Sequence, residues 1–361
     1  MKQNIKKTFY SIEEYLETDI DMQEIKLLIL YLNKSKINDA IMSDLCNKLR
    51  ESIDLYDLKL FLSENKFGQN SFSILGLELQ NIVNLQSLLL DLKQNKLNNE
   101  KIKSLAETLG KCQKLESLIL YIDQNQITNQ GVEYLAFGLK RCLNIKTLEI
   151  DLSNIDIGSK NLNQLFFELK TCVNLTNLSL RLSQCNISSQ RHINPFEGLR
   201  KFQNLKNLNL NLQCNQINDD QIVLLGIELG FIASLTSLFL GFYFNQISTS
   251  GYSNFIEGIS NCKGLFTLKL YMGQNMIGNE DILLKDSFSK FQNLNNFIID
   301  LSSNQFTLLN AMQLSYELKQ SETLTSLALN MSSNKFGSEQ TNKIIINLKK
   351  IKKLVNLQTY F

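Results

Sequence analysis

A single residue type returns at a fixed interval along almost the whole chain. Asparagine, or a residue in its place, recurs every 30 residues, with one 29-residue step between positions 275 and 304. The asparagines of this series are Asn65, Asn95, Asn125, Asn215, Asn245, Asn275, Asn304 and Asn334, and its other members are Ser35, Ile155 and Cys185. A fixed period of this length indicates stacked copies of one small supersecondary unit, so function is sought on an extended surface rather than in a pocket.

The residues around each of these positions, here called rungs, define the repeating unit. Apolar residues stand 10, 7, 5 and 3 positions before the rung and 2 positions after it, as in Leu115, Leu118, Leu120, Ile122 and Ile127 around Asn125. The alternation over residues 118–122 predicts a half-buried strand. Beyond the rung the apolar spacing becomes helical, as in Val132, Leu135, Ala136 and Leu139. Each repeat is therefore predicted to contain a strand, a turn, a helix and a return loop.

This pattern resembles the leucine-rich repeat, specifically the longer class seen in ribonuclease inhibitor and in the activating protein of the GTPase Ran. It recurs about eleven times between Ile25 and Phe361. The usual family string is L-x-x-L-x-L-x-x-N-x-L, whereas this chain reads L-x-x-L-x-L-x-L-x-x-N-x-I. Two added residues should lengthen each strand by about 6 to 7 Å.

The resemblance implies an α/β solenoid of horseshoe shape, with a parallel sheet on the concave face and helices on the convex face. The spacing of the elements supports this curvature. Neighbouring strands pair about 4.8 Å apart, whereas packed helices need roughly 8 to 10 Å between their axes. A stack of such units should therefore bend with its sheet on the inside.

The rung asparagines are predicted to hold the turns that leave the strands. An asparagine amide can hydrogen-bond backbone groups, so stacked asparagines should form a ladder inside the solenoid. Ser35 can still hydrogen-bond, and cysteine, present at Cys185, is a familiar replacement in the family that the pattern resembles. Ile155 cannot hydrogen-bond, and Asn154 precedes it, so we expect a locally shifted turn there.

Two regions are predicted along the chain. Residues 1–24 should form an N-terminal cap with a short helix, because Ser11 to Glu14 has the form of a capping box. Residues 25–361 should form a leucine-rich-repeat array of about eleven repeats that ends in a partial twelfth strand around Leu357. Two explanations of this last strand stay open: it caps the array, or the chain is a piece of a longer protein.

Composition and charge narrow the classes of function. Hydrophobic residues make up 43% of the chain and charged residues 20%, and there is one proline, so no linker divides it. No apolar run approaches the roughly 18 residues that span a bilayer, and residues 1–10 lack the apolar core of a signal peptide. We therefore expect no membrane span and a cytoplasmic location. The net charge is only +2, and no aromatic residues interleave the lysines at 349–353, so no nucleic-acid partner is expected.

The cysteines occupy positions that belong to the core of the repeat. Cys112, Cys142 and Cys172 are consecutive 30-residue equivalents, and other repeats place Ile82 and Phe202 there. A position shared with large apolar residues is a core position, and cysteine behaves there as a small buried hydrophobe. The sequence thus predicts reduced structural thiols and no metal site.

The only histidine, His192, is the single candidate for a general base. No sequence motif for a nucleophile, a phosphate loop or a zinc site accompanies it. The better explanation of this segment is a late helix start, with Asn194 as N-cap, Pro195 at the first helical position and Glu197 at the third. We expect no catalytic residue and no cofactor.

The strand positions that face outward carry the functional information, because the core does not dictate their identity. They form two groups. The first aromatic patch consists of Ile29, Tyr31, Phe61, Leu89, Ile119 and Tyr121, edged by Asp91, Asp123 and Asp151. The second aromatic patch consists of Phe239, Tyr243, Phe244 and Tyr271. Exposed, clustered aromatic residues are typical anchors of protein interfaces, and acidic neighbours favour a partner with a basic surface. The alternative is that long strands tolerate β-branched and aromatic residues on both faces.

The sequence therefore predicts a non-enzymatic scaffold that binds a partner protein on the concave face of its sheet. One alternative is a GTPase-activating regulator of a small Ran-like GTPase, by resemblance to the Ran-activating protein. Another is a structural subunit of a large assembly, in which an exposed last strand would allow self-association through the C-terminal edge.

Overall fold

The computed structural model describes residues 5–68, 70–189, 193–280 and 287–361 and divides into two compact units. The first unit comprises residues 1–157 and 168–181, and the second comprises residues 158–167 and 182–361. Strands and helices alternate along the chain in both. None of the described helices is long and apolar enough to cross a lipid bilayer.

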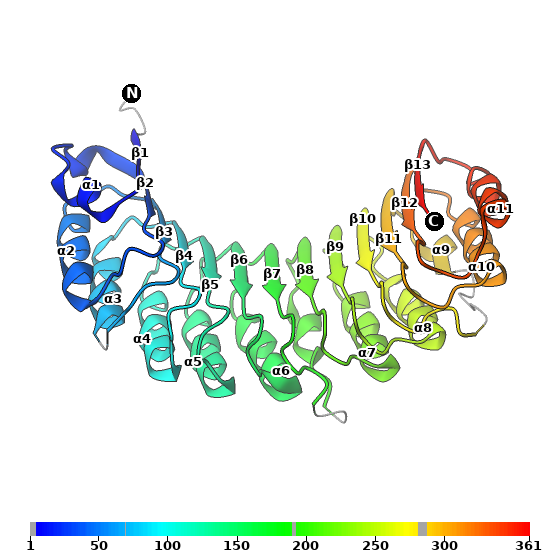
Figure 1. Cartoon of the computed structure of the whole chain (residues 1–361), viewed down its shortest axis with the longest axis horizontal. Coiled ribbons are helices and arrows are strands. Elements are labelled where there is room, and N and C mark those ends of the chain that lie inside the picture. Colours follow the sequence, from blue (N-terminus) through cyan, green and yellow to red (C-terminus); the bar gives the residue numbers. More distant parts are fainter. Residues whose placement is uncertain (1–4, 69, 190–192, 281–286) are drawn as a thin grey trace. The chain divides into compact units, whose positions relative to one another are not determined.

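The first unit has a parallel sheet of seven described strands with helices against one of its faces (Figure 1). Its strands are β1 (Ile5–Phe9), β2 (Ile25–Tyr31), β3 (Asp57–Phe61), β4 (Ser87–Asp91), β5 (Ser117–Tyr121), β6 (Thr147–Asp151) and β7 (Asn177–Arg181). Its helices are α1 (Ile12–Glu17), α2 (Asp39–Leu49), α3 (Ser71–Asn81), α4 (Asn99–Leu109), α5 (Asn129–Leu139) and the 3-10 helix η1 (Met22–Glu24). From β2 to β7 each strand pairs with the next one along the chain, and paired residues such as Leu58 and Leu88 are 30 positions apart.

The second unit repeats this arrangement with six described strands (Figure 1). Its strands are β8 (Asn207–Asn211), β9 (Ser237–Gly241), β10 (Thr267–Tyr271), β11 (Asn296–Asp300), β12 (Ser326–Asn330) and β13 (Asn356–Tyr360). Its helices are α6 (Gly158–Leu169, of which 168–169 count with the first unit), α7 (Asp219–Gly230), α8 (Thr249–Ile259), α9 (Ser287–Lys290), α10 (Leu308–Lys319), α11 (Ser338–Leu348) and the 3-10 helix η2 (Glu197–Lys201). Paired residues are again 30 positions apart, except between β10 and β11, where Leu270 pairs with Ile299.

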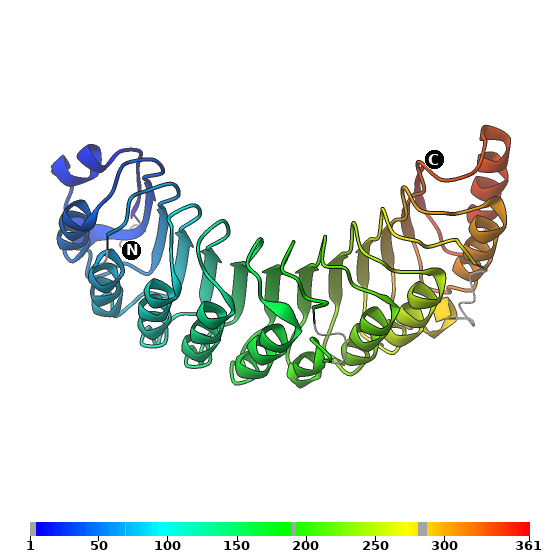
Figure 2. The same cartoon turned by 60° about the horizontal axis from the view of Figure 1, so that its bottom comes forward.

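Alternation along strands β3 to β12 separates a buried face from an open face. On β5, Leu118 and Leu120 are fully buried against the helices, whereas Ile119 and Tyr121 are half-buried on the other face of the sheet. Burying one such leucine side chain contributes about 1.5 to 3 kcal/mol. In each unit the helices lie on one side of the sheet (Figure 2), and the opposite side is here called the open face. Hydrogen bonds between neighbouring repeats also continue past the strands, as from Leu62 N to Asp91 O at 2.8 Å.

The predicted asparagine ladder is confirmed. Asn215 donates from Nδ2 to Leu182 O at 2.7 Å and to Gln213 O at 3.0 Å. Its Oδ1 accepts hydrogen bonds from Cys185 N at 2.9 Å and from Ile187 N at 3.2 Å. One buried amide thus satisfies four backbone groups of two successive turns. Corresponding donations to the preceding repeat come from Asn65, Asn95, Asn125, Asn245, Asn275, Asn304 and Asn334.

The predicted shift of the turn at Ile155 is wrong. Ile155 occupies the rung itself and is 1% exposed. Asn154 is exposed and takes a left-handed conformation (φ 63°), as Gln94 and Gln124 do at the equivalent positions. Ile155 N donates to Leu152 O at 3.2 Å, within its own turn. Burial of the apolar side chain replaces the amide contacts.

The N-terminal segment contains an element that the sequence did not predict. Helix α1 begins as expected, with the Ser11 hydroxyl accepting a hydrogen bond from Glu14 N at 3.1 Å. Strand β1 precedes it and pairs in parallel with β2, so that Thr8 lies opposite Ile29. Its residues do not alternate between buried and exposed, and only Phe9 is fully buried. A strand without apolar alternation gives no period-two signal.

The segment after His192 differs from its predicted form, and His192 itself lies outside the described residues. Asn194 does cap a turn, since its Oδ1 accepts a hydrogen bond from Phe196 N at 2.9 Å. The helix that follows is the 3-10 helix η2, which begins at Glu197 with Phe196 as its N-cap residue. The predicted cap is therefore two residues early. Pro195 delays the start, and the five residues of η2 are the helical residues that the structure describes between Pro195 and Phe202.

The core positions predicted for the cysteines are confirmed. Cys142 and Cys172 are buried, and their thiols donate to Leu109 O and Leu139 O of the preceding repeat, both at 3.4 Å. Burial raises the pKa of the Cys142 thiol to about 12. Of the seven cysteines, only Cys214 is exposed.

We expect one of the seven thiols to react rapidly with Ellman's reagent in the folded protein. The thiolate is the attacking species, and burial disfavours both ionisation and access at the other six positions. Cys214→Ser should abolish the fast phase, and unfolding in guanidinium should release all of the thiols of either form. A fast phase of two or more thiol equivalents in the native protein would contradict the burial of the other six cysteines.

Candidate functional site

Three aromatic rings are stacked on the open face of the first unit. Tyr31 at the end of β2 lies against Phe61 at the end of β3, with ring centroids 4.6 Å apart and planes 14° from parallel. Tyr10, directly after β1, stacks on the other side of Tyr31 at 5.4 Å and 7°. Tyr10 is 70% exposed and Tyr31 is 38% exposed. We call these three residues the aromatic stack. Tyr10 was not predicted as a site residue because strand β1 was not predicted.

The other apolar members of the first aromatic patch are less accessible than the sequence implied. Leu89 and Ile119 are half-buried on β4 and β5. Ile29 is only 7% exposed, because β1 pairs with β2 and brings Thr8 opposite it. Ile29 is therefore a buried residue beneath the patch and contributes little surface for a partner to contact.

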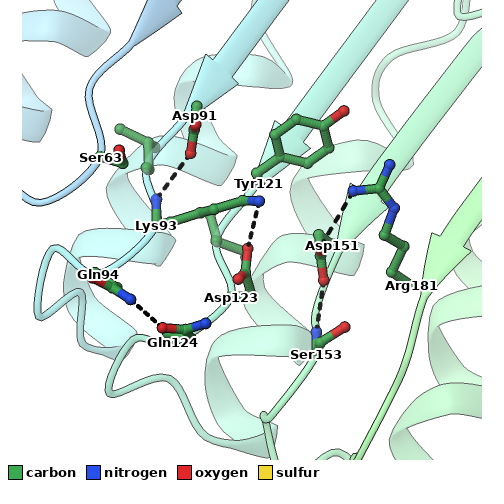
Figure 3. A network of polar contacts seen from close by, with 12 residues as sticks. Ser63, Asp91, Lys93, Gln94, Tyr121, Asp123, Gln124, Asp151, Ser153 and Arg181 are labelled. Atoms are coloured by element: carbon green, nitrogen blue, oxygen red, sulfur yellow. Dashed lines mark hydrogen bonds and ion pairs between the residues drawn. The ribbon is translucent and has the colours of Figure 1, made fainter. Parts of the chain in front are cut away.

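A polar network continues across the open face beyond Phe61, centred on Tyr121 (Figure 3). The hydroxyl of Tyr121 donates to Glu149 Oε1 at 2.9 Å. Arg181 lies 2.7 Å from Glu149 Oε1 and 3.5 Å from Asp151 Oδ2, with its guanidinium 5.1 Å from the centre of the Tyr121 ring. The ammonium group of Lys93 lies 4.7 Å from the same ring centre. Tyr121 is thus held by a hydrogen bond and two cations.

Carboxylates outnumber cations in this network. The acidic cluster consists of Asp91, Asp123, Glu149 and Asp151, and the cations in contact with it are Lys93 and Arg181. Four negative charges against two positive ones leave a net charge of −2. Glu149, Lys93 and Arg181 were not predicted as site residues. Glu149 and Arg181 do stand in the same outward-facing columns as the predicted residues, which is the signal that could have found them.

Two carboxylates of the cluster are incompletely satisfied. Asp123 is 6% exposed, and its Oδ1 accepts no hydrogen bond from the described residues; the Lys93 ammonium is 3.7 Å away. Asp91 accepts one described hydrogen bond, from the backbone N of Lys93 at 3.3 Å. Burial raises the pKa of both carboxyl groups, and the charge of Asp151 adds to the effect.

The structure brings together three of the four residues of the second aromatic patch, on the open face of the second unit. The Tyr271 ring lies 5.1 Å from Phe239 and 6.2 Å from Tyr243, centre to centre. The Tyr243 hydroxyl donates to Asp300 Oδ2 at 2.6 Å. A Cβ at Gly273 would come within 2.3 Å of the Tyr243 ring, so a side chain there would displace this ring. The fourth residue, Phe244, follows Tyr243 in the turn and is 58% exposed.

Asp123 and Asp300 form a matched pair for a stability test. We expect Asp123→Asn to leave the melting temperature unchanged or to raise it by a few degrees. A carboxyl group whose folded-state pKa is raised stabilises the fold when protonated, and this contribution is lost as the pH rises through that pKa. At neutral pH the ionised Asp123 therefore opposes folding.

We expect Asp300→Asn to lower the melting temperature by several degrees at neutral pH. Burial alone would raise the pKa of Asp300, but hydrogen bonds from Ser302, Tyr243 and Asn330 hold it below its usual value. A lowered pKa gives stability above the unfolded-state pKa, and this stability is lost as the pH falls. Thermal unfolding followed by circular dichroism checks both variants, and equal losses of stability would contradict the contrast between these carboxylates.

Comparison with known proteins bears on the fold. No family model and no curated protein matches the sequence. An internalin (inlF) from Listeria monocytogenes has a solved structure that aligns with 97% of this chain and 88% of its own, at 16% sequence identity and a TM-score of 0.52. A second, internalin C2 of the same organism, aligns with 81% of this chain and 91% of its own, at 18% identity and a TM-score of 0.39. The first likeness, with the parallel strands and alternating helices, confirms the predicted α/β leucine-rich-repeat solenoid.

Proposed function

We propose that this protein is a non-enzymatic scaffold that binds a partner protein on its open sheet face. The observation that carries the proposal is the aromatic stack of Tyr10, Tyr31 and Phe61, with its 70% exposed outer ring. Aromatic side chains gain most when their faces are removed from water, and they dominate the energetics of protein interfaces. A ring stack that projects from a rigid sheet is already ordered, so binding costs little side-chain entropy.

The contact surface of the first unit extends from the stack across the sheet. Tyr121 serves as a further aromatic anchor, and Leu89 and Ile119 supply apolar area between the anchors. Asp91, Asp123 and Asp151 supply negative charge beside them and favour a partner with a basic surface. Rows of residues on consecutive strands thus form one continuous surface on a parallel sheet.

The second aromatic patch is proposed as a separate contact region. Phe244 adopts φ 58°, whereas its equivalents at this left-handed position include Gln124, Cys214 and Gln274. The turn of each repeat imposes this conformation, so what distinguishes Phe244 is a large aromatic ring with 58% exposure. Phe239, Tyr243 and Tyr271 supply the neighbouring aromatic surface.

The test is affinity capture from native extract with three baits: the intact chain, a Tyr10→Ser/Tyr31→Ser/Phe61→Ser variant, and a Phe137→Ser variant. Phe137 is a matched control because it is an aromatic residue of α5 with 51% exposure, outside the open face. We expect a specific protein to be recovered by the intact chain and by the Phe137 variant but lost with the triple variant. Equal recovery by all three baits would contradict the use of the open face.

The proposal also includes a cytoplasmic location of the protein and its subclass of leucine-rich repeat. Buried thiols such as Cys142 and Cys172 fit a reducing compartment, which supports a cytoplasmic location. Helices of eleven or twelve residues in most repeats favour the longer, ribonuclease-inhibitor-like class of the fold.

Stimulation of GTP hydrolysis, assayed with a panel of small GTPases, separates the regulator alternative from the scaffold.

A second candidate is self-association through β13. This strand pairs with β12 along one edge, and no described strand pairs with its other edge. Unpaired strand edges are templates for β-pairing with a second chain. Sedimentation velocity over a range of concentrations tests the idea. A concentration-dependent dimer supports it, and a monomer at all concentrations contradicts it.

A further inference from the structure

We propose that the acidic cluster of the first unit holds an arginine or lysine side chain of a basic partner segment, while an apolar side chain of the same segment packs on the aromatic stack. This inference rests on the proposed function, because it names the chemistry of the partner bound at that face. It assigns a specific recognition site centred on Asp91 and Asp123.

Asp91 lies between two aromatic residues in the sheet. In the strand register, Phe61 on β3 is paired with Asp91 on β4, and Asp91 is paired with Tyr121 on β5. Neighbouring strands lie about 4.8 Å apart, so the carboxylate stands between two aromatic side chains on the open face. A guanidinium or ammonium group is attracted both by aromatic faces and by a carboxylate. Phe61 and Asp91 provide one of each, whereas the Tyr121 ring is already contacted by Lys93 and Arg181.

The protein itself shows this mode of contact next to the proposed site. Arg181, on the far side of Tyr121 from Asp91, places its guanidinium 5.1 Å from the centre of that ring and 2.7 Å from Glu149 Oε1. On the Asp91 side the Lys93 ammonium already lies 4.7 Å from the centre of the Tyr121 ring, so an arginine from a partner would contact Asp91 together with Phe61. The open face thus already contains one arginine held between an aromatic ring and carboxylates.

The acidic cluster contains more negative charge than its neighbouring cations balance. The four carboxylates of the acidic cluster are matched by two cations. The buried Oδ1 of Asp123 has no hydrogen-bond donor among the described residues, and Lys93 lies 3.7 Å from it. Burial is the main cause of the raised pKa of Asp91 and of Asp123, and the charge of Asp151 adds to it. An incoming cation with N–H donors would add positive charge and donate to the half-buried carboxylate of Asp91.

The type of cation follows from the arrangement of the carboxylates. In the part of the chain that the structure describes, no group of three histidine, cysteine, aspartate or glutamate residues could hold a metal ion. The cluster is spread along a row of strands and interleaved with Tyr121 and Lys93, which suits an extended organic cation. We therefore assign the site to a side chain rather than to a metal.

The spacing of the two subsites predicts the ligand pattern. Tyr31 on β2 and Asp91 on β4 are two strand steps apart, about 10 Å. An extended segment advances about 3.3 Å per residue. The partner segment should therefore carry a large apolar residue about three positions from its arginine or lysine.

The test is selection from a phage library of random twelve-residue peptides, panned against the intact chain and three variants. The variants are Asp91→Asn/Asp123→Asn, Tyr31→Ser/Phe61→Ser and the control Phe137→Ser. We expect the intact chain and the control to enrich peptides that combine an apolar residue with arginine or lysine. The double asparagine variant should lose the preference for the basic residue and keep the preference for the apolar one.

Fluorescence polarisation with the best enriched peptide makes the test quantitative. Asp91→Asn/Asp123→Asn should weaken its binding about tenfold to a hundredfold. Replacing the basic residue of the peptide with glutamine should weaken binding to the intact chain equally, and the two changes together should have little further effect. Independent, additive losses would overturn the proposed pairing.

The remaining outcomes separate this inference from the proposed function. Peptides without basic residues that still require Tyr31 and Phe61 would overturn the cation site and leave the scaffold function standing. Enrichment that survives both open-face variants, or no enrichment at all, would count against both. An unchanged basic preference in the double asparagine variant would overturn the assignment to Asp91 and Asp123.

Discussion

Replacement of Asn215 by alanine is expected to destabilise the second unit by about 3 to 5 kcal/mol. The side chain is 1% exposed, and its amide satisfies the carbonyls of Leu182 and Gln213 and the backbone donors of Cys185 and Ile187. Each buried polar group left without a partner costs about 1 to 3 kcal/mol, and partial relaxation of the turn recovers some of the total. The loss comes mainly from orphaned backbone groups rather than from the missing side chain.

The natural control for this substitution is Asn209→Ala on the same repeat. Asn209 is a half-buried residue of β8 on the open face, so its removal should cost less than about 0.5 kcal/mol. Urea unfolding followed by circular dichroism measures both variants, and hydrogen exchange at the amides of Cys185 and Ile187 localises the effect. Similar unfolding midpoints for the two variants would contradict a structural role of the ladder. Ile155 shows that one rung can carry a buried apolar residue in place of asparagine.

The second large effect is expected for Gly138→Ala in α5. A Cβ at this position would lie 2.3 Å from Ala106 O and 2.6 Å from Ala106 C, both backbone atoms of α4. Because the backbone of a packed helix cannot move locally, the two helices would have to separate. Overpacking of this kind typically costs 1 to 3 kcal/mol, and we expect about 2 to 3 kcal/mol here.

The sign of this effect is diagnostic, because glycine to alanine in an exposed helix interior normally stabilises by about 1 kcal/mol. Gly337→Ser provides the control, since a Cβ there meets nothing within 4 Å and serine is a good N-cap residue for α11. That variant should be as stable as the parent or slightly more so. Stabilisation by Gly138→Ala in a denaturant titration would show that α4 and α5 are less tightly packed than the structure indicates.

The recurrence of leucine and asparagine was enough to predict the fold. Leu118 and Leu120 alternate with outward-facing residues, and the same spacing returns 30 residues later. The strand, its core face and the rung could therefore all be assigned from the sequence. Burial of a periodic apolar face is a local consequence of strand geometry, which sequence shows directly. Strand β1 was missed because residues 5–9 do not alternate, and they become a strand only by pairing with β2.

The candidate site was predictable in part. Tyr31, Phe61 and Tyr121 stand in outward columns, and the structure places them on the open face as expected. Tyr10 joins the stack through β1, and Ile29 is lost from the accessible surface for the same reason. Both differences have one cause, namely an edge strand whose place is decided by hydrogen bonding to a neighbour rather than by its own pattern.

The chain by itself determined the repeat, the buried asparagine ladder, the core position of the cysteines and the columns of side chains on the open face. These follow from short-range periodicity, because each repeat has the same local problem of burying leucines and satisfying a turn. Tertiary structure alone decided how charges are matched across the open face. Arg181 contacts Glu149 and Asp151, which precede it by about 30 positions in the chain. Asp123 Oδ1 has no hydrogen-bond donor among the described residues. Such pairings depend on side-chain reach and desolvation between stacked repeats, which no single repeat encodes.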